Sequence, residues 1–395
     1  MSSICQRHVG LKELRLTNFR SYPSLSLKMD ESLPPVVLTG NNGAGKTNIL
    51  EAISLLAPGK GLRSAKLSEL ARKEPVFSKE PTTNVIPMPV QWAVWAKTTT
   101  PSGEWDLGTG CSSGQEHRLV KVDGTQLKNQ AELGNYISIL WLTPTMDKLF
   151  SGDPASRRRF LDRLVQTFIP EHASLLSDYN YALKQWNTLL REGNRDNSWL
   201  SLLEEKIACC GVAIAADRKD VQMRLIQFLS KEQAEIPFPS AEMTLQGVIE
   251  NALDEMKALD VEIFFKENLK KSRHLVADGG SVSGIHTSDF SILHREKGID
   301  ASLCSTGEQK ALLISVILSQ TKALMQEKGI CPLLLLDEVS AHLDIGRREA
   351  LFKLLCVLPA QVWMTGTEPL AFASLSQEAQ HFNIEHLTAT ERAVA

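Results

Sequence analysis

Residues 38–50 form a glycine-rich stretch whose residue types and spacing are typical of phosphate binding. The pattern G-x-x-x-x-G-K-T is formed by Gly40, Asn41, Asn42, Gly43, Ala44, Gly45, Lys46 and Thr47, and Asn48 follows it. Glycines let the backbone fold closely round an anion, so that N–H groups and the positive end of the next helix point at it. Lys46 is predicted to reach the terminal phosphates of a nucleotide, and the Thr47 hydroxyl to bind Mg²⁺. An apolar strand at 36–38 and a helix at 48–56 flank the loop, as a phosphate loop requires.

Two acids, Asp337 and Glu338, come at the end of the apolar run 331–336. Such a run predicts a buried parallel strand, and ligands of open α/β sheets bind at the carboxyl edge where these acids would lie. Asp337 is therefore predicted to hold Mg²⁺, and Glu338 to orient or deprotonate the attacking water. Acids after a strand often only cap the next turn, but the phosphate loop upstream favours the catalytic interpretation.

A third group of small and polar residues lies directly before an apolar helix predicted at 311–325. Its members are Ser305, Gly307, Glu308 and Gln309. Locally they form a helix N-cap with an acid in the first turn. A helix N-terminus about thirty residues ahead of the acidic strand is also an anion site. Because the phosphate loop already serves the nucleotide of its own chain, we predict that this second site reaches a nucleotide held by another copy.

These three motifs resemble those of the ABC-type ATPases of chromosome maintenance, and among them the RecF family, which is related to the SMC proteins. Further matches lie at 16–22, at 157–162 and in the D-loop at 340–344. The order of the motifs, with signature and Walker B far from Walker A, is more specific than any one of them. The chain departs from the family at 284–289, where Gly-Ile-His-Thr-Ser-Asp replaces the usual Gly-x-His-Arg-Asp-Asp, and 142–147 offers no glutamine for a Q-loop.

The resemblance implies an α/β fold: an ABC-type P-loop ATPase head, with a mixed sheet and an antiparallel β layer, and an inserted helical arm domain. We expect the head to comprise 1–155 and 276–395 and the arm to comprise 156–275. The alternating patterns at 90–97, 104–107 and 117–122 predict the antiparallel layer. No heptad pattern persists through residues 156–275. The sequence therefore predicts a short helical arm and not a long coiled coil.

The resemblance also implies a function. It implies slow, DNA-stimulated hydrolysis of ATP with Mg²⁺, and a homodimer that closes on ATP and clamps duplex or gapped DNA without sequence preference. It implies RecR as a partner and, through RecR, the loading of RecA. Arg20, in the turn after the first predicted strand, would lie near the nucleotide; the alternative is a solvated turn residue.

The composition sets limits on these partners. The 395 residues carry a net charge of −3, so contacts with nucleic acid must come from local basic clusters. No segment has the length of a membrane span or the pattern of a signal peptide, and we expect a cytoplasmic protein without a membrane partner. The seven cysteines show no metal-binding spacing.

Basic clusters at three places are candidates for DNA contact. They comprise Lys60, Arg63, Lys66, Arg72, Arg157, Arg158, Arg159, Lys270 and Lys271. A basic run is often only a solvated surface, but the first cluster follows the phosphate loop, where a DNA surface could respond to the nucleotide. The three adjacent arginines at 157–159 repel one another unless an anion relieves them, and DNA phosphate and an acidic partner in the head are equally good candidates.

Two other classes of protein share the phosphate loop. The ATP-binding subunit of a transporter is less favoured, because the segment 18–20 and the large helical insertion are not typical of such subunits. A kinase or a metabolic P-loop enzyme would have no need of the signature at 305–309. The sequence therefore favours an ATP-dependent DNA-binding protein of recombinational repair.

Overall fold

The computed structural model describes residues 8–72, 92–112, 117–193, 196–231, 238–385 and 388–391. The chain divides into two compact units, Met1–Met146 with Leu324–Ala395, and Asp147–Ala323. The second unit extends beyond the predicted helical segment 156–275 on both sides. It therefore includes the start of the signature helix, whereas the Walker A and Walker B motifs lie in the first unit.

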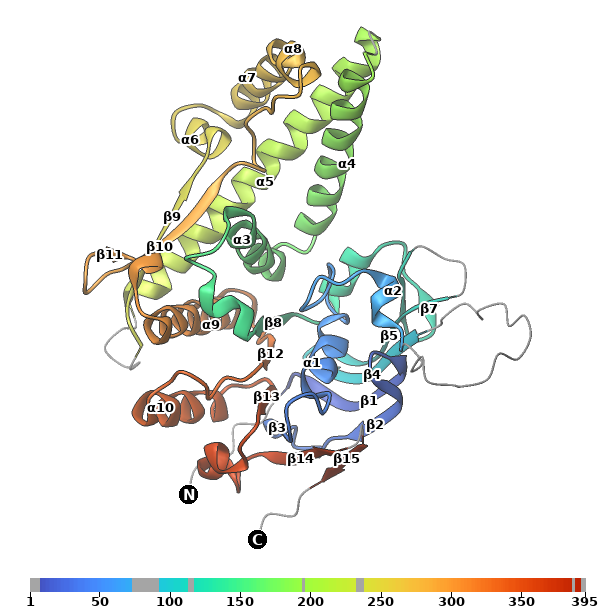
Figure 1. The fold of residues 1–395 in the computed structure, drawn as a ribbon, viewed down its shortest axis with the longest axis vertical. Helices are drawn as coiled ribbons and strands as arrows, with labels where there is room; N and C mark the ends of the chain where they lie inside the picture. Colours follow the sequence, from blue (N-terminus) through green and yellow to red (C-terminus); the bar gives the residue numbers. More distant parts are fainter. Residues whose placement is uncertain are drawn as a thin grey trace, which may run out of the picture. The chain divides into compact units, whose positions relative to one another are not determined.

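The first unit contains a six-stranded sheet that carries the predicted catalytic residues (Figure 1). Its strands, in spatial order, are β15 (Thr388–Glu391), β14 (Gln380–Glu385), β3 (Val36–Thr39), β13 (Val362–Gly366), β12 (Leu333–Leu336) and β8 (Ile139–Leu142). All pairs are parallel except β14 with β15. Every residue of β3, β8, β12 and β13 is buried, as continuous apolar runs predict for a parallel sheet covered on both faces.

A second sheet in the first unit is antiparallel throughout. Its strands, in spatial order, are β2 (Tyr22–Lys28), β1 (Gly10–Phe19), β4 (Trp92–Thr100), β5 (Gly103–Cys111), β6 (Leu119–Val122) and β7 (Thr125–Gln126). The predicted antiparallel layer is thus present; β4 and β5 extend further than the sequence indicated, whereas β6 is shorter than the predicted strand at 117–122. Residues 90 and 91 of the first predicted strand lie outside the described part. Alternate residues of β4 are buried, and Trp92 packs edge-on against Phe19.

Short helices complete the first unit. They are α1 (Lys46–Ser54), α2 (Leu67–Leu70), η1 (Gln130–Asn135), α10 (Ile345–Cys356) and η4 (Pro369–Leu375), and η2 (Pro144–Lys148) spans the boundary between the units. Of these, α1 follows the phosphate loop directly. Its apolar residues, among them Ile49, Leu50 and Ile53, are fully buried.

The second unit is built from helices and a small sheet. The helices are α3 (Pro154–Phe168), α4 (His172–Arg191), α5 (Asn197–Lys231), α6 (Val248–Glu255), α7 (Ala258–Lys271), α8 (Arg273–Ala277), η3 (Ala301–Leu303) and the part of α9 (Thr306–Lys328) up to Ala323. The sheet contains β9 (Ala241–Gln246), β10 (Asp289–His294) and β11 (Ile299–Asp300). The long helices α4 and α5 lie side by side (Figure 1), and Tyr179, Trp186, Ile207 and Phe265 belong to their shared core.

Buried charged side chains join the helices of this unit. Arg218, which is 1% exposed, donates from Nε to Asp162 Oδ1 at 2.7 Å and from Nη1 to Glu250 Oε1 at 3.4 Å. His172 lies between Asp162 and Asp217, with nitrogen–oxygen distances of 3.2 and 2.8 Å. Burial lowers the pKa of His172, but the two carboxylates outweigh this effect and raise it above its ordinary value. A protonated His172 therefore offsets part of the buried negative charge.

Among the described residues, no helix is long and apolar enough to span a membrane.

Candidate functional site

The phosphate loop adopts a backbone that only glycine tolerates at its two ends. Gly40 has φ 144° and Gly45 has φ 106°, in the region that favours glycine. A Cβ atom at Gly40 would lie 2.3 Å from the carbonyl oxygen of Ile384, and one at Gly45 would lie 2.5 Å from the hydroxyl of Tyr22. The first contact comes from β14 and the second from β2, so both sheets hold the loop in shape.

Lys46, the first residue of α1, lies over this loop. Its Nζ atom donates to the carbonyl oxygens of Gly40 at 2.7 Å and Asn41 at 2.9 Å. Burial lowers the pKa of Lys46, and the nearby carboxylates of Glu338 and Asp337 oppose that shift. The ammonium group is thus placed between the glycine-rich loop and the two predicted catalytic acids.

One hydroxyl group from helix α1 and one from strand β13 contact the Walker B aspartate. Asp337 Oδ1 accepts hydrogen bonds from Thr47 Oγ1 at 3.0 Å and from Thr365 Oγ1 at 2.6 Å. The backbone N–H of Glu338 donates to the same Thr365 hydroxyl at 2.8 Å. Because β3, β13 and β12 are neighbours in the parallel sheet, residues that follow these strands meet at one edge. The structure therefore brings together the predicted metal ligands and the predicted base.

Glu338 has an unusual backbone. Its φ is 48°, in the left-handed region, which for a residue other than glycine costs on the order of 1–3 kcal/mol. The hydrogen bond to Thr365 is one contact that holds this conformation. Such strain is often found where a side chain must be aimed at a substrate.

The donor set at this edge fits Mg²⁺. Thr47 and Asp337 both offer oxygen ligands, and Asp337 Oδ2 has no hydrogen-bond partner within the described residues. In the part of the chain that the structure describes, no group of three or more His, Cys, Asp or Glu side chains could hold a metal ion. A site with one carboxylate and one hydroxyl agrees with the usual binding of Mg²⁺ by few protein ligands together with nucleotide phosphates.

Arg20 is held by the helix that follows the phosphate loop. Its Nε and Nη2 atoms form a bidentate ion pair with Glu51, at 2.8 and 2.5 Å. Arg63 donates from Nη1 to Asn48 Oδ1 at 2.9 Å and to Glu51 Oε2 at 3.3 Å. The side chains of two predicted functional arginines therefore meet at one buried acid, and the predicted contact of Arg20 with a nucleotide stays a prediction.

The signature residues form a closed N-cap in the second unit. Ser305 Oγ donates to Glu308 Oε2 at 2.8 Å, and the backbone N–H of Glu308 points back at Ser305 Oγ at 3.4 Å. An ion pair with Lys297 and the hydrogen bonds from Ser305 lower the pKa of Glu308 to about 2. Gln309 Nε2 donates to the carbonyl oxygen of Cys304 at 2.9 Å. The structure thus contains the predicted cap, and a role toward a second nucleotide stays a prediction.

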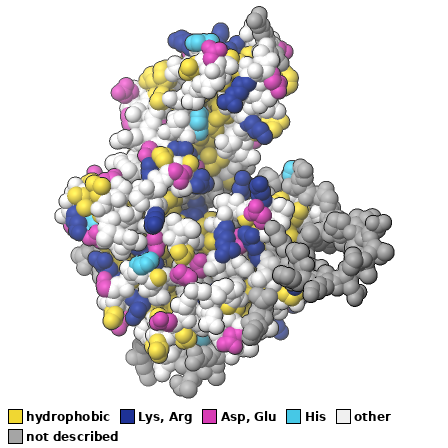
Figure 2. Space-filling view, in the orientation of Figure 1, with side chains coloured by type: hydrophobic (Ala, Val, Ile, Leu, Met, Phe, Trp, Pro, Cys, Tyr) yellow, Lys and Arg dark blue, Asp and Glu magenta, His cyan; other side chains and the backbone are white. Residues whose placement is uncertain are grey.

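The DNA-binding candidates differ in how accessible they are. Exposed residues are Lys60, Arg63, Lys66, Arg159, Lys270 and Lys271, and partly buried ones are Arg72, Arg157 and Arg158. Figure 2 shows basic and acidic side chains interspersed over the face drawn, as the small net charge predicts. The first cluster belongs to the first unit, and the other two clusters belong to the second.

The three adjacent arginines find partners inside the second unit. Arg157 forms a bidentate ion pair with Asp289, with both distances 2.8 Å, and this guanidinium lowers the pKa of Asp289. Arg158 Nη1 donates to the carbonyl oxygen of Ser288 at 2.6 Å, and Arg159 donates to Ser156 Oγ at 2.6 Å. An acid 132 positions further along the chain thus relieves Arg157.

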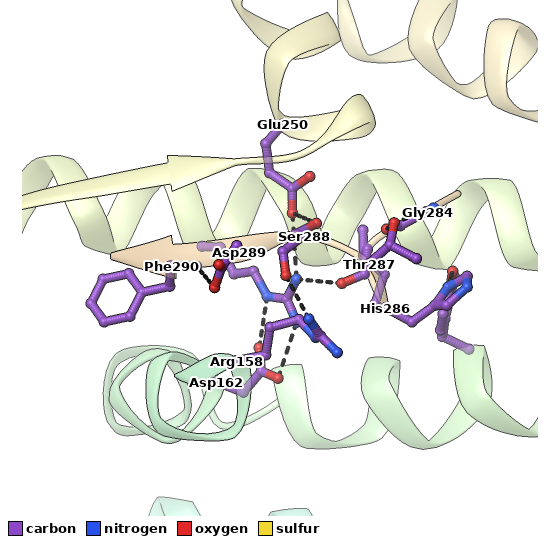
Figure 3. Close-up of polar contacts among 12 residues, drawn as sticks. Arg158, Asp162, Glu250, Gly284, His286, Thr287, Ser288, Asp289 and Phe290 are labelled. Atoms are coloured by element: carbon purple, nitrogen blue, oxygen red, sulfur yellow. Dashed lines mark hydrogen bonds and ion pairs between the residues drawn. The ribbon is translucent and has the colours of Figure 1, made fainter. Parts of the chain in front are cut away.

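The altered segment 284–289 lies where β10 begins (Figure 3). The hydroxyl of Thr287 donates to the carbonyl oxygen of Gly284 at 2.8 Å, and the hydroxyl of Ser288 donates to Glu250 Oε1 at 2.6 Å. Arg158 comes to the same segment from α3. The two residues that depart from the family pattern therefore take part in contacts within the second unit.

Sequence reasoning missed two residues at the nucleotide site. Glu51 is an acid within the apolar run 49–53 of α1, and that isolated acid was a usable signal. Tyr22 is fully buried against Gly45, and its hydroxyl has no hydrogen-bond partner among the described residues. The hydroxyl of Thr365, on β13, lies beside Asp337.

Comparisons with known proteins find relatives that cover nearly the whole chain. The family described as AAA domain matches residues 13–145. The DNA replication and repair protein RecF of Mesorhizobium japonicum is 41% identical over 386 residues, which cover 97% of this chain and 97% of that protein. The solved structure of the recombination mediator protein RecF-ATPrS in the RecFOR pathway has a TM-score of 0.80 and 25% identity, over 99% of this chain and 100% of that one.

A more distant likeness concerns the fold alone. A Smc head domain with an extended coiled coil, derived from Pyrococcus furiosus, has a TM-score of 0.50 and 15% identity, over 97% of this chain and 96% of that one. The predicted fold class, an ABC-type ATPase head with a mixed sheet, an antiparallel layer and an inserted helical part, is confirmed.

Proposed function

The chain belongs to the RecF family of DNA replication and repair proteins, and from this premise we propose that it is a slow ATPase whose hydrolysis regulates DNA binding. In this proposal two copies close on ATP, clamp DNA near single-strand gaps, and hydrolysis reopens them. The family assignment does not favour a transporter subunit or a metabolic P-loop enzyme, the two alternatives that the phosphate loop alone left open.

The observation that carries the proposal is the cluster of Thr47, Asp337, Thr365 and Glu338 at one edge of the parallel sheet. The glycine-rich loop and Lys46 would bind the phosphates, and Thr47 with Asp337 would hold Mg²⁺, which neutralises phosphate charge when bound. Glu338 would then orient or deprotonate the attacking water, because it directly follows Asp337 and its carboxylate acts on the pKa of Lys46 in the phosphate loop.

The signature supports an active site shared between two copies. Ser305 and Gly307 lie at the N-terminal end of the 23-residue helix α9, where backbone N–H groups favour an anion. The phosphates bound by the first unit already have Lys46 and Thr47. We therefore propose that the signature of one copy completes the nucleotide site of another, so that activity depends on a dimer.

DNA contact is proposed for the exposed basic loop that follows α1, with the clusters of the second unit as further candidates. One such loop neutralises few phosphates, so a single copy should bind weakly. Two copies that close on ATP would place two loops along one duplex. We also propose RecR as a partner and, through RecR, RecA, because a solved relative is described as a recombination mediator protein in the RecFOR pathway.

The test is DNA binding measured against salt, with ATP held unhydrolysed and with ADP. We expect ATP-dependent binding without sequence preference, and a slope of log K against log salt that is about twice as steep in the ATP state. Replacing Lys60, Arg63 and Lys66 together by alanine should weaken binding about equally for unrelated sequences. The same variant should flatten the slope by close to 0.9 for each DNA phosphate that the protein no longer neutralises.

A matched control removes three exposed lysines elsewhere in the first unit: Lys28, Lys121 and Lys128. This variant has the same change in net charge and should keep the wild-type slope. Equal losses in both variants would mean that net charge, and not the loop, governs binding. Unchanged affinity and slope in the first variant would rule out this loop as the DNA surface.

A further inference from the structure

Helix α1 carries a buried acid that the phosphate-binding motif does not explain. Glu51 is 1% exposed, and its carboxylate accepts hydrogen bonds from both Arg20 and Arg63. Glu51, Arg20 and Arg63 together therefore carry two positive charges and one negative charge. Arg20 donates one hydrogen bond to each carboxylate oxygen, the geometry of a strong pair, and Arg63 has only a longer bond to one of these oxygens.

The structure shows which arginine is held firmly. Arg20 has both oxygens of Glu51, and its Nη1 donates to the carbonyl oxygen of Glu69 at 2.8 Å. Arg63 uses only Nη1, at 3.3 Å from Glu51, and its side chain is 43% exposed against 19% for Arg20. Its remaining N–H groups have no hydrogen-bond partner within the described residues. Arg63 is thus the arginine that can turn to an external anion.

Arg63 is also fastened to the phosphate-loop helix. The same Nη1 donates to Asn48 Oδ1 at 2.9 Å, and Asn48 is two residues after Lys46. One residue earlier in the basic loop, the backbone N–H of Leu62 donates to Ser54 Oγ at 2.7 Å, at the end of α1. A change in the contacts of Arg63 therefore acts directly on a residue at the start of α1.

We propose that Glu51 is a positioning residue that shares its carboxylate between Arg20 and Arg63 and so links DNA contact to the phosphate loop. This inference rests on the proposed function. Without DNA, Glu51 keeps Arg63 on Asn48. A DNA phosphate that binds Arg63 replaces the long bond to Glu51 and the bond to Asn48, while Arg20 stays on Glu51 and anchors the β1–β2 turn to α1.

The main test is Glu51→Gln, which keeps the shape of the side chain and removes its charge. The released Arg63 should bind DNA more tightly, whereas the slope of log K against log salt should keep its wild-type value, because Arg63 contacts one DNA phosphate in both proteins. The ratio of ATP hydrolysis with DNA to hydrolysis without DNA should fall to about one. A residue with only a structural role would lower both DNA affinity and hydrolysis.

Glu69→Gln is the matched control, because it makes the same change in charge beside the same loop. The Glu69 carboxylate lies near the backbone N–H of Lys66, at 3.4 Å, and has no hydrogen bond to Arg63. This variant should keep the wild-type ratio of hydrolysis with and without DNA. If Glu51→Gln and Glu69→Gln change that ratio equally, the effect is one of net charge and the inference is overturned.

Arg63→Gln gives a second route that avoids a buried change, since this side chain is partly exposed. Arg63→Gln should weaken DNA binding and reduce the ratio of ATP hydrolysis with DNA to hydrolysis without DNA to about one. Adding Glu51→Gln to this variant should not lower that ratio further. A wild-type ratio in Arg63→Gln overturns the inference even if Glu51→Gln does not fold. Wild-type protein without any response to DNA would instead refute the proposed function, and the inference with it.

Discussion

Thr365 offers a direct test of how the sheet sets the catalytic acids. It is fully buried on β13, and its hydroxyl donates to Asp337 and accepts from the backbone of Glu338. Thr365→Val keeps the branched shape, which suits a central strand, and replaces the hydroxyl with a methyl group. The change therefore separates the polar contacts from the packing.

The expected size follows from the two hydrogen bonds that the substitution removes. A hydrogen bond to a charged group is worth about 1.5–3 kcal/mol, and the bond to Asp337 is short, at 2.6 Å. If this energy is lost from the transition state, hydrolysis slows by about 10- to 150-fold. Without its bond to Thr365, Glu338 also loses a restraint on its left-handed backbone, so the base should move from its position.

Three measurements check this expectation: steady-state hydrolysis at saturating ATP, affinity for a fluorescent ATP analogue, and thermal unfolding. Thr365→Val should hydrolyse ATP about 10- to 150-fold more slowly. Its nucleotide affinity should stay within a few-fold of wild type, because the phosphate loop is unchanged. Thr365→Ser is the control; it keeps the hydroxyl and should stay close to the wild-type rate.

Two results would contradict the reasoning. A folded Thr365→Val protein that hydrolyses ATP at the wild-type rate would show that the hydroxyl does not position the acids. Equal losses in Thr365→Val and Thr365→Ser would show that the methyl packing, and not the hydrogen bonds, sets the rate.

Three further predictions concern the remaining parts of the site and the second unit. Glu338→Gln should bind ATP but hydrolyse it slowly, and light scattering with ATP should show a persistent dimer; a monomer with normal hydrolysis would place the base elsewhere. Mixing Lys46→Ala protein with Ser305→Arg protein should restore one intact site per heterodimer, and no recovery in proven heterodimers would count against the shared site. The pKa of His172 is higher in the folded protein than its value of about 6.5 in the unfolded chain. The positive charge of His172 therefore stabilises the fold fully below the unfolded pKa, and this stabilisation is lost as pH rises through the folded pKa. Urea unfolding should therefore show that the free energy of unfolding falls less for His172→Gln than for wild type as pH rises through the folded pKa. An equal fall in both proteins would refute the role of His172.

Much of the nucleotide site follows from the sequence, because its motifs are local. The phosphate loop is a continuous segment in which each glycine and the lysine have fixed positions along the backbone. The Walker B acids likewise end an apolar run, and such runs form central parallel strands whatever their partners are. The cap at Ser305 and Glu308 is also a contact between residues three positions apart.

Other features depend on contacts between distant parts of the chain. Nothing in the sequence near Arg157 shows that Asp289 neutralises it, since 132 positions separate them. The meeting of Thr365 with Asp337 depends on the order of strands in the sheet, which periodicity does not specify. The pairing of β9 with β10 in the second unit was missed for the same reason, because more than forty residues separate the two strands.

The arginines near the phosphate loop show the division most clearly. The resemblance to the RecF family identified Arg20 as a functional candidate, and the basic composition of the segment after the phosphate loop identified Arg63. Only the tertiary structure decided that both share Glu51, since that depends on how the β1–β2 turn and the basic loop pack against α1. A charge is a property of the residue, whereas the partner that restrains it is a property of the fold.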